Sequence, residues 1–334
     1  MAHPPAPHIA VLGDGGWGTT LAIHLHRLGH RPRLWGAFPE YVHTLAQHRE
    51  NKKFLPGVRI PRSLEITSDL AHAVQGAHLI VLAVPSQYLR LVIRRCKELI
   101  SPQHAFLNVA KGIEHETLDR MSEVIAQELG PVPHAALSGP NIAPEIARGQ
   151  PASSVVASQD QALTAKIQRL LMSERFRIYT STDIIGVELG GALKNPIAIA
   201  AGIGDGLGFG ANAKASLVTR GIVEMARLGV AMGARETTFW GLSGLGDLVT
   251  TCLSGRNRWL GEQLGRSRSL KRTLASTPMV IEGVETTRAA QALGQKYGVE
   301  LPIIEQVHAI LFEHRAPRIA LQTLMRRAGK AEAV

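Results

Sequence analysis

Gly13-Asp14-Gly15-Gly16-Trp17-Gly18 is the stretch of sequence that decides the fold. It follows a short apolar run at residues 8–12 and precedes a stretch at 19–28 that predicts a helix. In a strand–turn–helix unit, Gly13 permits the tight turn, Gly15 lets a pyrophosphate approach the backbone, and Gly18 packs helix against strand. The helix start adds free N–H groups for phosphate. The stretch therefore predicts a dinucleotide site.

Further apolar runs extend this unit along the chain. They lie at residues 33–35, 79–84, 106–110, 135–137 and 153–157, with helical stretches between them. Strands that alternate with helices predict a parallel, doubly wound sheet. After about residue 183 long helical segments replace the strands. We predict an α/β fold: a Rossmann-type NAD(P)-binding domain at 1–182, then an all-α substrate and catalytic domain at 183–334.

Composition limits the class of protein. The chain of 334 residues is long enough for two domains. Two cysteines form no disulfide framework, residues 1–12 resemble no signal peptide, and no apolar run of about 18 residues is evident. We expect a cytoplasmic protein with no membrane span and no metal site.

The formal net charge of +10 leaves more than one partner class open. The Lys and Arg residues are scattered, and no recognised nucleic-acid motif accompanies them, so we expect no specific nucleic-acid binding. A solvated basic surface and a field that steers anionic small molecules are the two remaining interpretations.

The choice of nucleotide stays open. NAD sites usually carry an acid about 20 residues beyond the glycine turn, at the end of the second strand. Here residues 33–40 read RLWGAFPE, so no acid stands at the strand end and Glu40 comes several residues late. NADP, with a nearby Arg or Lys on its 2′-phosphate, is therefore as compatible with the sequence as NAD.

Two segments follow strands at the sheet edge where ligands bind. Lys111 follows the apolar run at 106–110, and Ser138-Gly139-Pro140-Asn141 follows the run at 135–137. Because ligands of doubly wound sheets lie beyond the carboxyl ends of the strands, an ammonium or a backbone donor here can meet an anion or a carbonyl.

Lys194 is the exception in a helical stretch almost devoid of charge, GGALKNP at 190–196. Burial lowers the pKa of an ammonium group unless an anion compensates for the lost hydration. A lysine whose pKa is lowered in this way can act as an acid–base group. Asp247 can hold Lys194 or a substrate hydroxyl. Arg256, at the start of a predicted helix, combines a guanidinium with free N–H groups and suits a phosphate monoester.

Together these motifs closely resemble the NAD(P)-dependent glycerol-3-phosphate dehydrogenase family. The resemblance covers nearly the whole chain and runs through GDGGWGTTLA, NKKFLPG, VPS, KGIE, SGPNIAPE, GGALKNPIAIAAGIGDGLGFGANAKASLVTRG, GLGDLVTTC, GRNR and IEGVETT. It implies reduction of dihydroxyacetone phosphate to sn-glycerol 3-phosphate, a precursor of glycerophospholipids. A homodimer is one expected assembly.

The resemblance also implies site residues. Lys194 matches the catalytic proton donor and acceptor, and Lys111 a lysine contacting both ligands. Substrate positions are matched by Gly139, Asn141, Lys194, Asp247, Gly255, Arg256 and Asn257. Cofactor positions are matched by Gly16, Trp17, Ala37, Ala143, Arg256, Val280 and Glu282, beside the fingerprint glycines.

This chain departs from many bacterial members at several of these positions. Asn141 stands where they carry Ser or Thr, and Gly255 where they carry Ser, with Ser254 as a candidate replacement. Pro196 stands where other members often carry Val, and Ala37 stands where some members carry a basic or polar residue. Two other functions remain as alternatives: a dehydrogenase for another phosphorylated or hydroxyacid substrate, and a dinucleotide-binding regulator without turnover.

Overall fold

The computed structural model describes residues 8–329 and 331–332, so residues 1–7, which bear on the expected absence of a signal peptide, lie outside it. The chain forms two compact units. Unit 1 comprises residues 8–110, 121–137 and 141–184 of the described chain. Unit 2 comprises residues 111–120, 138–140 and the rest of the described chain from 185 on.

Unit 1 is built on an eight-stranded sheet of order β3-β2-β1-β4-β5-β6-β7-β8. The pairs β1–β2, β1–β4, β2–β3, β4–β5, β5–β6 and β7–β8 are parallel. Strand order reverses between β1 and β4, which is the point where doubly wound sheets bind ligands. The strands are β1 His8–Leu12, β2 Arg31–Trp35, β3 Glu65–Thr67, β4 Leu79–Leu82, β5 Ala105–Asn108, β6 His134–Ser138, β7 Ala152–Ala157 and β8 Phe176–Ser181.

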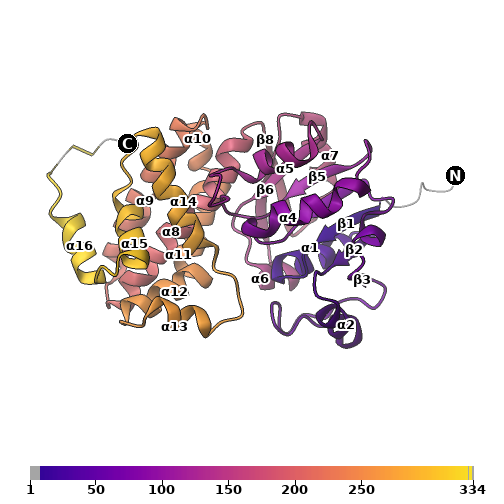
Figure 1. Cartoon of the computed structure of the whole chain (residues 1–334), viewed down its shortest axis with the longest axis horizontal. Coiled ribbons are helices and arrows are strands. Elements are labelled where there is room, and N and C mark those ends of the chain that lie inside the picture. Colours follow the sequence, from indigo (N-terminus) through magenta and orange to yellow (C-terminus); the bar gives the residue numbers. More distant parts are fainter. Residues whose placement is uncertain (1–7, 330, 333–334) are drawn as a thin grey trace. The chain divides into compact units, whose positions relative to one another are not determined.

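Helices cover both faces of this sheet (Figure 1). In β1, Ile9 and Val11 belong to one buried cluster and Ala10 and Leu12 to the other, because successive side chains of a strand point to opposite faces. One cluster includes residues of α1, α6 and α7, and the other residues of α3, α4 and α5. The helices of unit 1 are α1 Gly16–Arg27, α2 Pro39–His48, α3 Leu70–Val74, α4 Ser86–Cys96, η1 Lys97–Leu99, α5 Met121–Leu129, α6 Ala143–Ala147 and α7 Gln161–Leu171.

The doubly wound sheet confirms the predicted fold class, and the six predicted strands are present within a few residues of their expected positions. Two strands were not predicted. The strand β3 has only three residues, EIT, and β8 reads FRIYTS, in which four of the six residues are exposed or half-buried. Neither has the continuous apolar run that identified the central strands.

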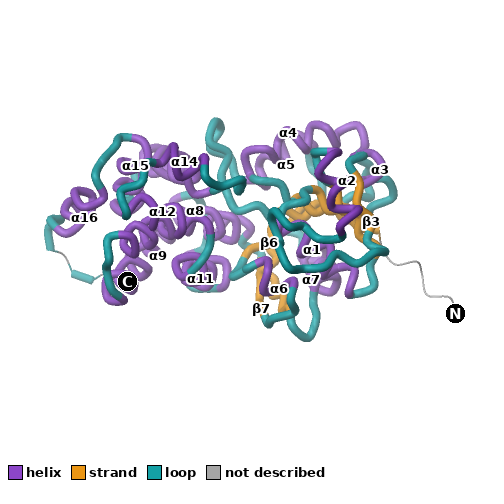
Figure 2. The backbone as a smooth tube through the Cα atoms, turned by 90° about the horizontal axis from the view of Figure 1, so that it is seen from below, coloured by secondary structure: helices purple, strands orange, loops and turns teal. Residues whose placement is uncertain are grey.

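Unit 2 is helical, and Figure 2 shows the purple helices that compose it. Two short segments of unit 2 come from the N-terminal half of the chain. Residues 111–120 follow β5, and residues 138–140 begin at the last residue of β6. The elements are α8 Ile184–Gly206, α9 Ala211–Ala231, α10 Glu236–Phe239, the π-helical turn η2 Leu242–Gly246, α11 Asp247–Leu253, α12 Arg256–Gly265, α13 Leu270–Ala275, α14 Glu282–Tyr297, α15 Pro302–Phe312 and α16 Pro317–Met325.

The helix α8 is the apolar axis of unit 2. Its length and composition would allow it to cross a membrane, but 89% of its most apolar 18-residue window is buried inside the structure. The sequence prediction of no membrane-length apolar segment overlooked this helix, because glycines and the charged residues Glu188, Lys194 and Asp205 interrupt its apolar residues.

The backbones of α8 and α12 touch. A Cβ at Gly202 would overlap the carbonyl oxygen of Arg258, and a Cβ at Gly261 would overlap that of Ile199. Gly206 and Gly265 approach each other in the same way, with a Cβ on Gly206 only 2.8 Å from Cα of Gly265. The absence of side chains at these positions therefore sets the distance between the two helices.

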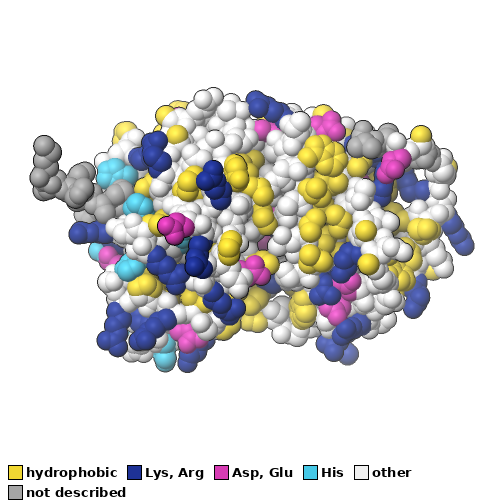
Figure 3. Space-filling view, turned by 180° about the vertical axis from the view of Figure 1, so that it is seen from behind, with side chains coloured by type: hydrophobic (Ala, Val, Ile, Leu, Met, Phe, Trp, Pro, Cys, Tyr) yellow, Lys and Arg dark blue, Asp and Glu magenta, His cyan; other side chains and the backbone are white. Residues whose placement is uncertain are grey.

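The basic charge is dispersed on the face drawn in Figure 3. Lys and Arg side chains are spread over that face, with Asp, Glu and His side chains among them. This view agrees with a solvated basic surface and shows no single basic stripe of the kind that tracks a nucleic-acid backbone.

Candidate functional site

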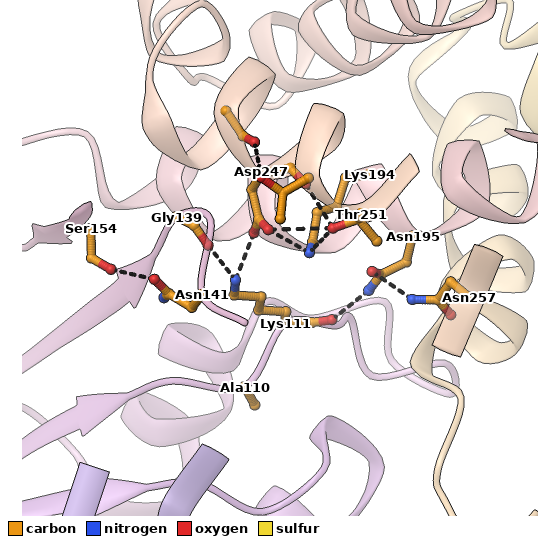
Figure 4. A network of polar contacts seen from close by, with 12 residues as sticks. Ala110, Lys111, Gly139, Asn141, Ser154, Lys194, Asn195, Asp247, Thr251 and Asn257 are labelled. Atoms are coloured by element: carbon orange, nitrogen blue, oxygen red, sulfur yellow. Dashed lines mark hydrogen bonds and ion pairs between the residues drawn. The ribbon is translucent and has the colours of Figure 1, made fainter. Parts of the chain in front are cut away.

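Three charged side chains of unit 2 meet in one buried cluster (Figure 4). Lys194 Nζ lies 2.7 Å from Oδ1 of Asp247, and Lys111 Nζ lies 2.6 Å from Oδ2 of the same carboxylate. Lys111 Nζ also donates to the carbonyl oxygen of Gly139 at 2.7 Å. The structure thus brings together four predicted site residues, and it pairs Asp247 with Lys194, one of the two interactions that the sequence left open for this carboxylate.

The cluster perturbs the acid–base chemistry of Lys194. Its side chain is buried, and this desolvation lowers its pKa from 10.5 to about 8, with a further lowering from the charge of Lys111. The negative charge of Asp247 opposes this shift. A pKa near 8 suits a group that must both give and take a proton near neutral pH, as the sequence suggested.

Two polar side chains that the sequence analysis missed complete the cluster. Lys194 Nζ donates to Oγ1 of Thr251 at 2.6 Å, and Thr251 Oγ1 donates to the Asp247 carbonyl at 2.7 Å. Asn195 Nδ2 donates to the Lys111 carbonyl at 3.0 Å, and its Oδ1 accepts from Nδ2 of Asn257 at 2.8 Å. Thr251 follows Asp247 by four residues on α11, so one helix face carries both, and this spacing was a usable signal.

The start of α12 gathers a second group of candidates in unit 2. The helix begins at Arg256, as predicted, with Gly255 before it and no side chain capping its N–H groups. Arg256 is exposed, and its Nη1 donates to the carbonyl of Val280 at 2.9 Å. Asn257 Oδ1 accepts from the backbone N–H of Gly283 at 3.0 Å, next to Glu282, which begins α14. Guanidinium and free helix N–H groups together form an anion receptor.

Ser254 does not aim a free hydroxyl at this receptor. Its Oγ donates to the carbonyl of Thr250 at 3.3 Å, one turn back in α11. Gly255 offers only its backbone, so neither Ser254 nor Gly255 aims a free side-chain hydroxyl at the start of α12.

The glycine turn occupies the predicted place in unit 1, directly after β1. Gly13 has a φ of 125°, and a Cβ there would lie 2.6 Å from the carbonyl of Ala83, just after β4. The turn therefore lies at the switch point of the sheet. A Cβ on Gly18 would overlap the carbonyl oxygen of Gly13, whereas nothing lies within 4 Å of the Cβ position of Gly15. The crowding and the open space are those expected for the third and second fingerprint glycines.

Of the other cofactor candidates of unit 1, Gly16 and Trp17 lie on α1, and Ala143 contacts it. Thr20 Oγ1 donates to the carbonyls of Gly16 and Ala143, at 2.8 and 3.2 Å. Nε1 of Trp17 is buried and has no hydrogen-bond partner in the described chain. Ala37 is exposed in the turn between β2 and α2.

Asn141 follows β6 and belongs to unit 1. Its Oδ1 accepts from Oγ of Ser154 at 2.6 Å, while its Nδ2 is buried without a hydrogen-bond partner among the described residues. Asn141 is therefore oriented to donate through the amide, which a Ser or Thr at this position would do through a hydroxyl.

No group of three or more His, Cys, Asp or Glu side chains that could hold a metal ion occurs among the described residues. The candidates thus divide between an amide-rich turn in unit 1 and a cationic cluster with an anion receptor in unit 2. The chemistry available is dinucleotide binding, proton transfer at an ammonium, and binding of a phosphate.

Comparison with known proteins agrees with this chemistry. Residues 8–164 match the NAD-dependent glycerol-3-phosphate dehydrogenase N-terminus, and residues 183–322 match the C-terminus of the same family. The glycerol-3-phosphate dehydrogenase [NAD(P)+] of Citrifermentans bemidjiense is 46% identical over 98% of this chain and 100% of its own length. That of Syntrophotalea carbinolica is 48% identical over 97% of this chain and 99% of its own.

Solved structures agree as well. The crystal structure of glycerol-3-phosphate dehydrogenase from Coxiella burnetii has a TM-score of 0.94 to this chain, with 40% sequence identity over 97% of this chain and 100% of the other. The chain therefore belongs to the NAD-dependent glycerol-3-phosphate dehydrogenase family.

Proposed function

We propose that this protein interconverts dihydroxyacetone phosphate and sn-glycerol 3-phosphate with NAD(P)H. The observation that carries the proposal is the cluster of Lys194, Asp247 and Lys111, in which a buried ammonium has a pKa near 8. The names of the relatives support the proposal. Both are glycerol-3-phosphate dehydrogenases [NAD(P)+], and they match 98% and 97% of this chain.

The residues of unit 1 fit a dinucleotide. The space at the Cβ position of Gly15 is open, so a pyrophosphate can approach the backbone there. The uncapped start of α1 offers backbone N–H donors to phosphate oxygens, and Nε1 of Trp17 is a further donor without a partner among the described residues. Gly13, Gly16 and Gly18 shape this turn. We assign Ala37 and Ala143 to the same ligand, and the family resemblance adds Lys111, Arg256, Val280 and Glu282 to its expected contacts. When bound, the dinucleotide supplies or accepts the hydride at C2 of the substrate.

Lys194 is the proton donor in ketone reduction. As C2 gains a hydride, the carbonyl oxygen gains negative charge and takes a proton from Nζ of Lys194, forming the hydroxyl of the product. In the reverse direction the neutral amine accepts that proton. Asp247 and Thr251 hold Nζ in place, and the charge of Lys111 stabilises the developing oxyanion.

The phosphate of the substrate belongs at the start of α12. Arg256 supplies a guanidinium, Asn257 an amide side chain, and Gly255 a backbone that a ligand can approach closely. Gly139 and Asn141 contact the rest of the substrate. A phosphate fixed at one end places the carbonyl at Lys194 in a single orientation.

The experiment is a turnover assay on the purified chain. Dihydroxyacetone phosphate should be reduced with at least one of NADH and NADPH, and the loss of reduced-nicotinamide absorbance measures this reaction. A protein that binds the dinucleotide without turnover would be the regulator considered as an alternative, and turnover only with another phosphorylated or hydroxyacid substrate would identify the other alternative. Either result contradicts the proposal.

The cellular setting is part of the same proposal. The product would supply glycerophospholipid synthesis in the cytoplasm, and both cysteines, Cys96 and Cys252, are free and buried, which suits a reducing compartment. We propose a homodimer, supported by the exposed apolar side chains of Trp240, just after α10, and of Val249 and Leu253 on α11. Size-exclusion chromatography with light scattering would test it.

A further inference from the structure

A carboxylate lies at the end of β2, although the sequence has a glycine there. Gly36 follows Trp35, the last residue of β2. A Cβ on Gly36 would overlap Oδ2 of Asp14 and would lie 2.6 Å from Cγ of the same side chain. The carboxylate of Asp14, from the glycine turn, therefore fills the space that a side chain at position 36 would occupy.

One oxygen of the Asp14 carboxylate has no donor among the described residues. Its Oδ2 is buried and has no hydrogen-bond partner among the described residues. Its backbone is fixed, because the Asp14 carbonyl accepts from Nδ2 of Asn51 at 2.7 Å and from Oγ1 of Thr19 at 3.3 Å. Burial raises the pKa of this carboxyl and outweighs the backbone N–H of Asp14 and the charge of Lys53, which both lower it.

The end of the second strand has a defined use in doubly wound sheets. The adenosine ribose of a bound dinucleotide lies there, and an acid accepts a hydrogen bond from its 2′-hydroxyl in NAD-selective sites. We propose that Asp14 supplies this acid from the glycine turn, so that this chain selects NAD over NADP. The inference rests on the dinucleotide binding of the proposed function and concerns only which dinucleotide is bound.

Charge supports the same choice. A 2′-phosphate would bring two negative charges toward a poorly hydrated carboxylate. Arg33, the arginine nearest the end of β2, is already engaged by Glu65 at 3.1 Å and by the carbonyl of Gln75 at 2.9 Å. Lys53 is a cation close enough to Asp14 to lower the pKa of its carboxyl; it is exposed, and its Nζ lies 5.0 Å from the centre of the Phe54 ring. Lys53 is the residue that would receive a 2′-phosphate if the inference is wrong.

The test measures binding of each dinucleotide to the full chain without substrate, by isothermal titration calorimetry. We expect the wild type to bind NADH more tightly than NADPH by about 10-fold or more, the effect of one hydrogen bond to a charged group. Asp14→Asn should weaken NADH, strengthen NADPH and lower this ratio by about 10- to 100-fold. Glu40→Gln is the matched control, since Glu40 is the exposed acid that follows β2 in sequence, and it should leave the ratio unchanged.

A second measurement needs no variant. The 2′-deoxyadenosine analogue of NADH should bind to the wild type more weakly than NADH by about 10-fold. Equal binding of the analogue and NADH would overturn the inference, and so would a selectivity ratio that moves in Glu40→Gln or Lys53→Gln but not in Asp14→Asn. Binding of neither dinucleotide would instead contradict the proposed function.

Discussion

Lys194 and Asp247 form a buried ion pair in which Nζ lies 2.7 Å from Oδ1. The second oxygen of the same carboxylate binds Lys111. One negative charge therefore faces two positive charges, and the remaining positive charge is available to an oxyanion that forms at the substrate.

Removal of the Lys194 ammonium should abolish proton transfer while leaving dinucleotide binding intact. Lys194→Ala is expected to reduce kcat by roughly 10²- to 10⁴-fold, the range for loss of a general acid. Steady-state kinetics gives kcat, and titration with NADH gives the affinity. A variant with wild-type kcat would exclude Lys194 as the proton donor.

The pH dependence of turnover should follow the pKa of Lys194, which is about 8. Ketone reduction requires the protonated form, so its kcat should be constant below pH 8 and fall about tenfold per pH unit above it. Alcohol oxidation requires the neutral amine and should rise through the same pH. Since the charge of Asp247 raises this pKa, Asp247→Asn should move the midpoint to lower pH. Glu300→Gln, which changes an exposed acid, should leave the midpoint where it is.

Loss of the Arg256 guanidinium should weaken substrate binding more than chemistry. Arg256→Ala is expected to raise KM for dihydroxyacetone phosphate by about 10- to 100-fold, the effect of one charge-assisted hydrogen bond. Arg266→Ala removes an exposed arginine just after the same helix and serves as control. An equal rise in both variants would indicate a general effect of charge rather than a phosphate contact.

Glu224 should make unfolding stability depend on pH. This buried carboxyl accepts from the backbone N–H of Ile303 at 2.8 Å, yet burial raises its pKa from 4.5 to about 7. The folded state therefore binds this proton more tightly than the unfolded state, so its contribution is complete below about pH 4.5 and is lost as the pH rises through 7. Glu224→Gln should flatten the change of Tm between pH 5 and 8. An unchanged slope would mean that another group dominates.

Short-range sequence patterns predicted where several candidate residues of both units lie along the chain. The glycine turn, the helix that follows it and the positions of Lys111 and Gly139 just beyond strands are all determined by contacts between near neighbours in sequence. The same reasoning found α12 starting at Arg256, because a glycine and a run of polar residues interrupt the apolar pattern there.

Tertiary contacts explain what the sequence did not reveal. Asn195 joins Lys111 to Asn257 across 84 and 62 positions of sequence, and no local pattern marks such a bridge. The carboxylate at the end of β2 was missed for the same reason, since it comes from Asp14 on another segment. The short strands β3 and β8 depend on pairing with a neighbour rather than on their own apolar content.

The glycine contact between α8 and α12 fixes the distance between the two helices that carry the proposed substrate contacts. Lys194 is carried by one of these helices and Arg256 by the other, and no side chain separates the two backbones where they meet. Rotamer changes cannot widen such a contact. The pair should therefore keep the spacing of Lys194 and Arg256 constant, and we expect a phosphorylated ketone one carbon longer to be a poorer substrate than dihydroxyacetone phosphate.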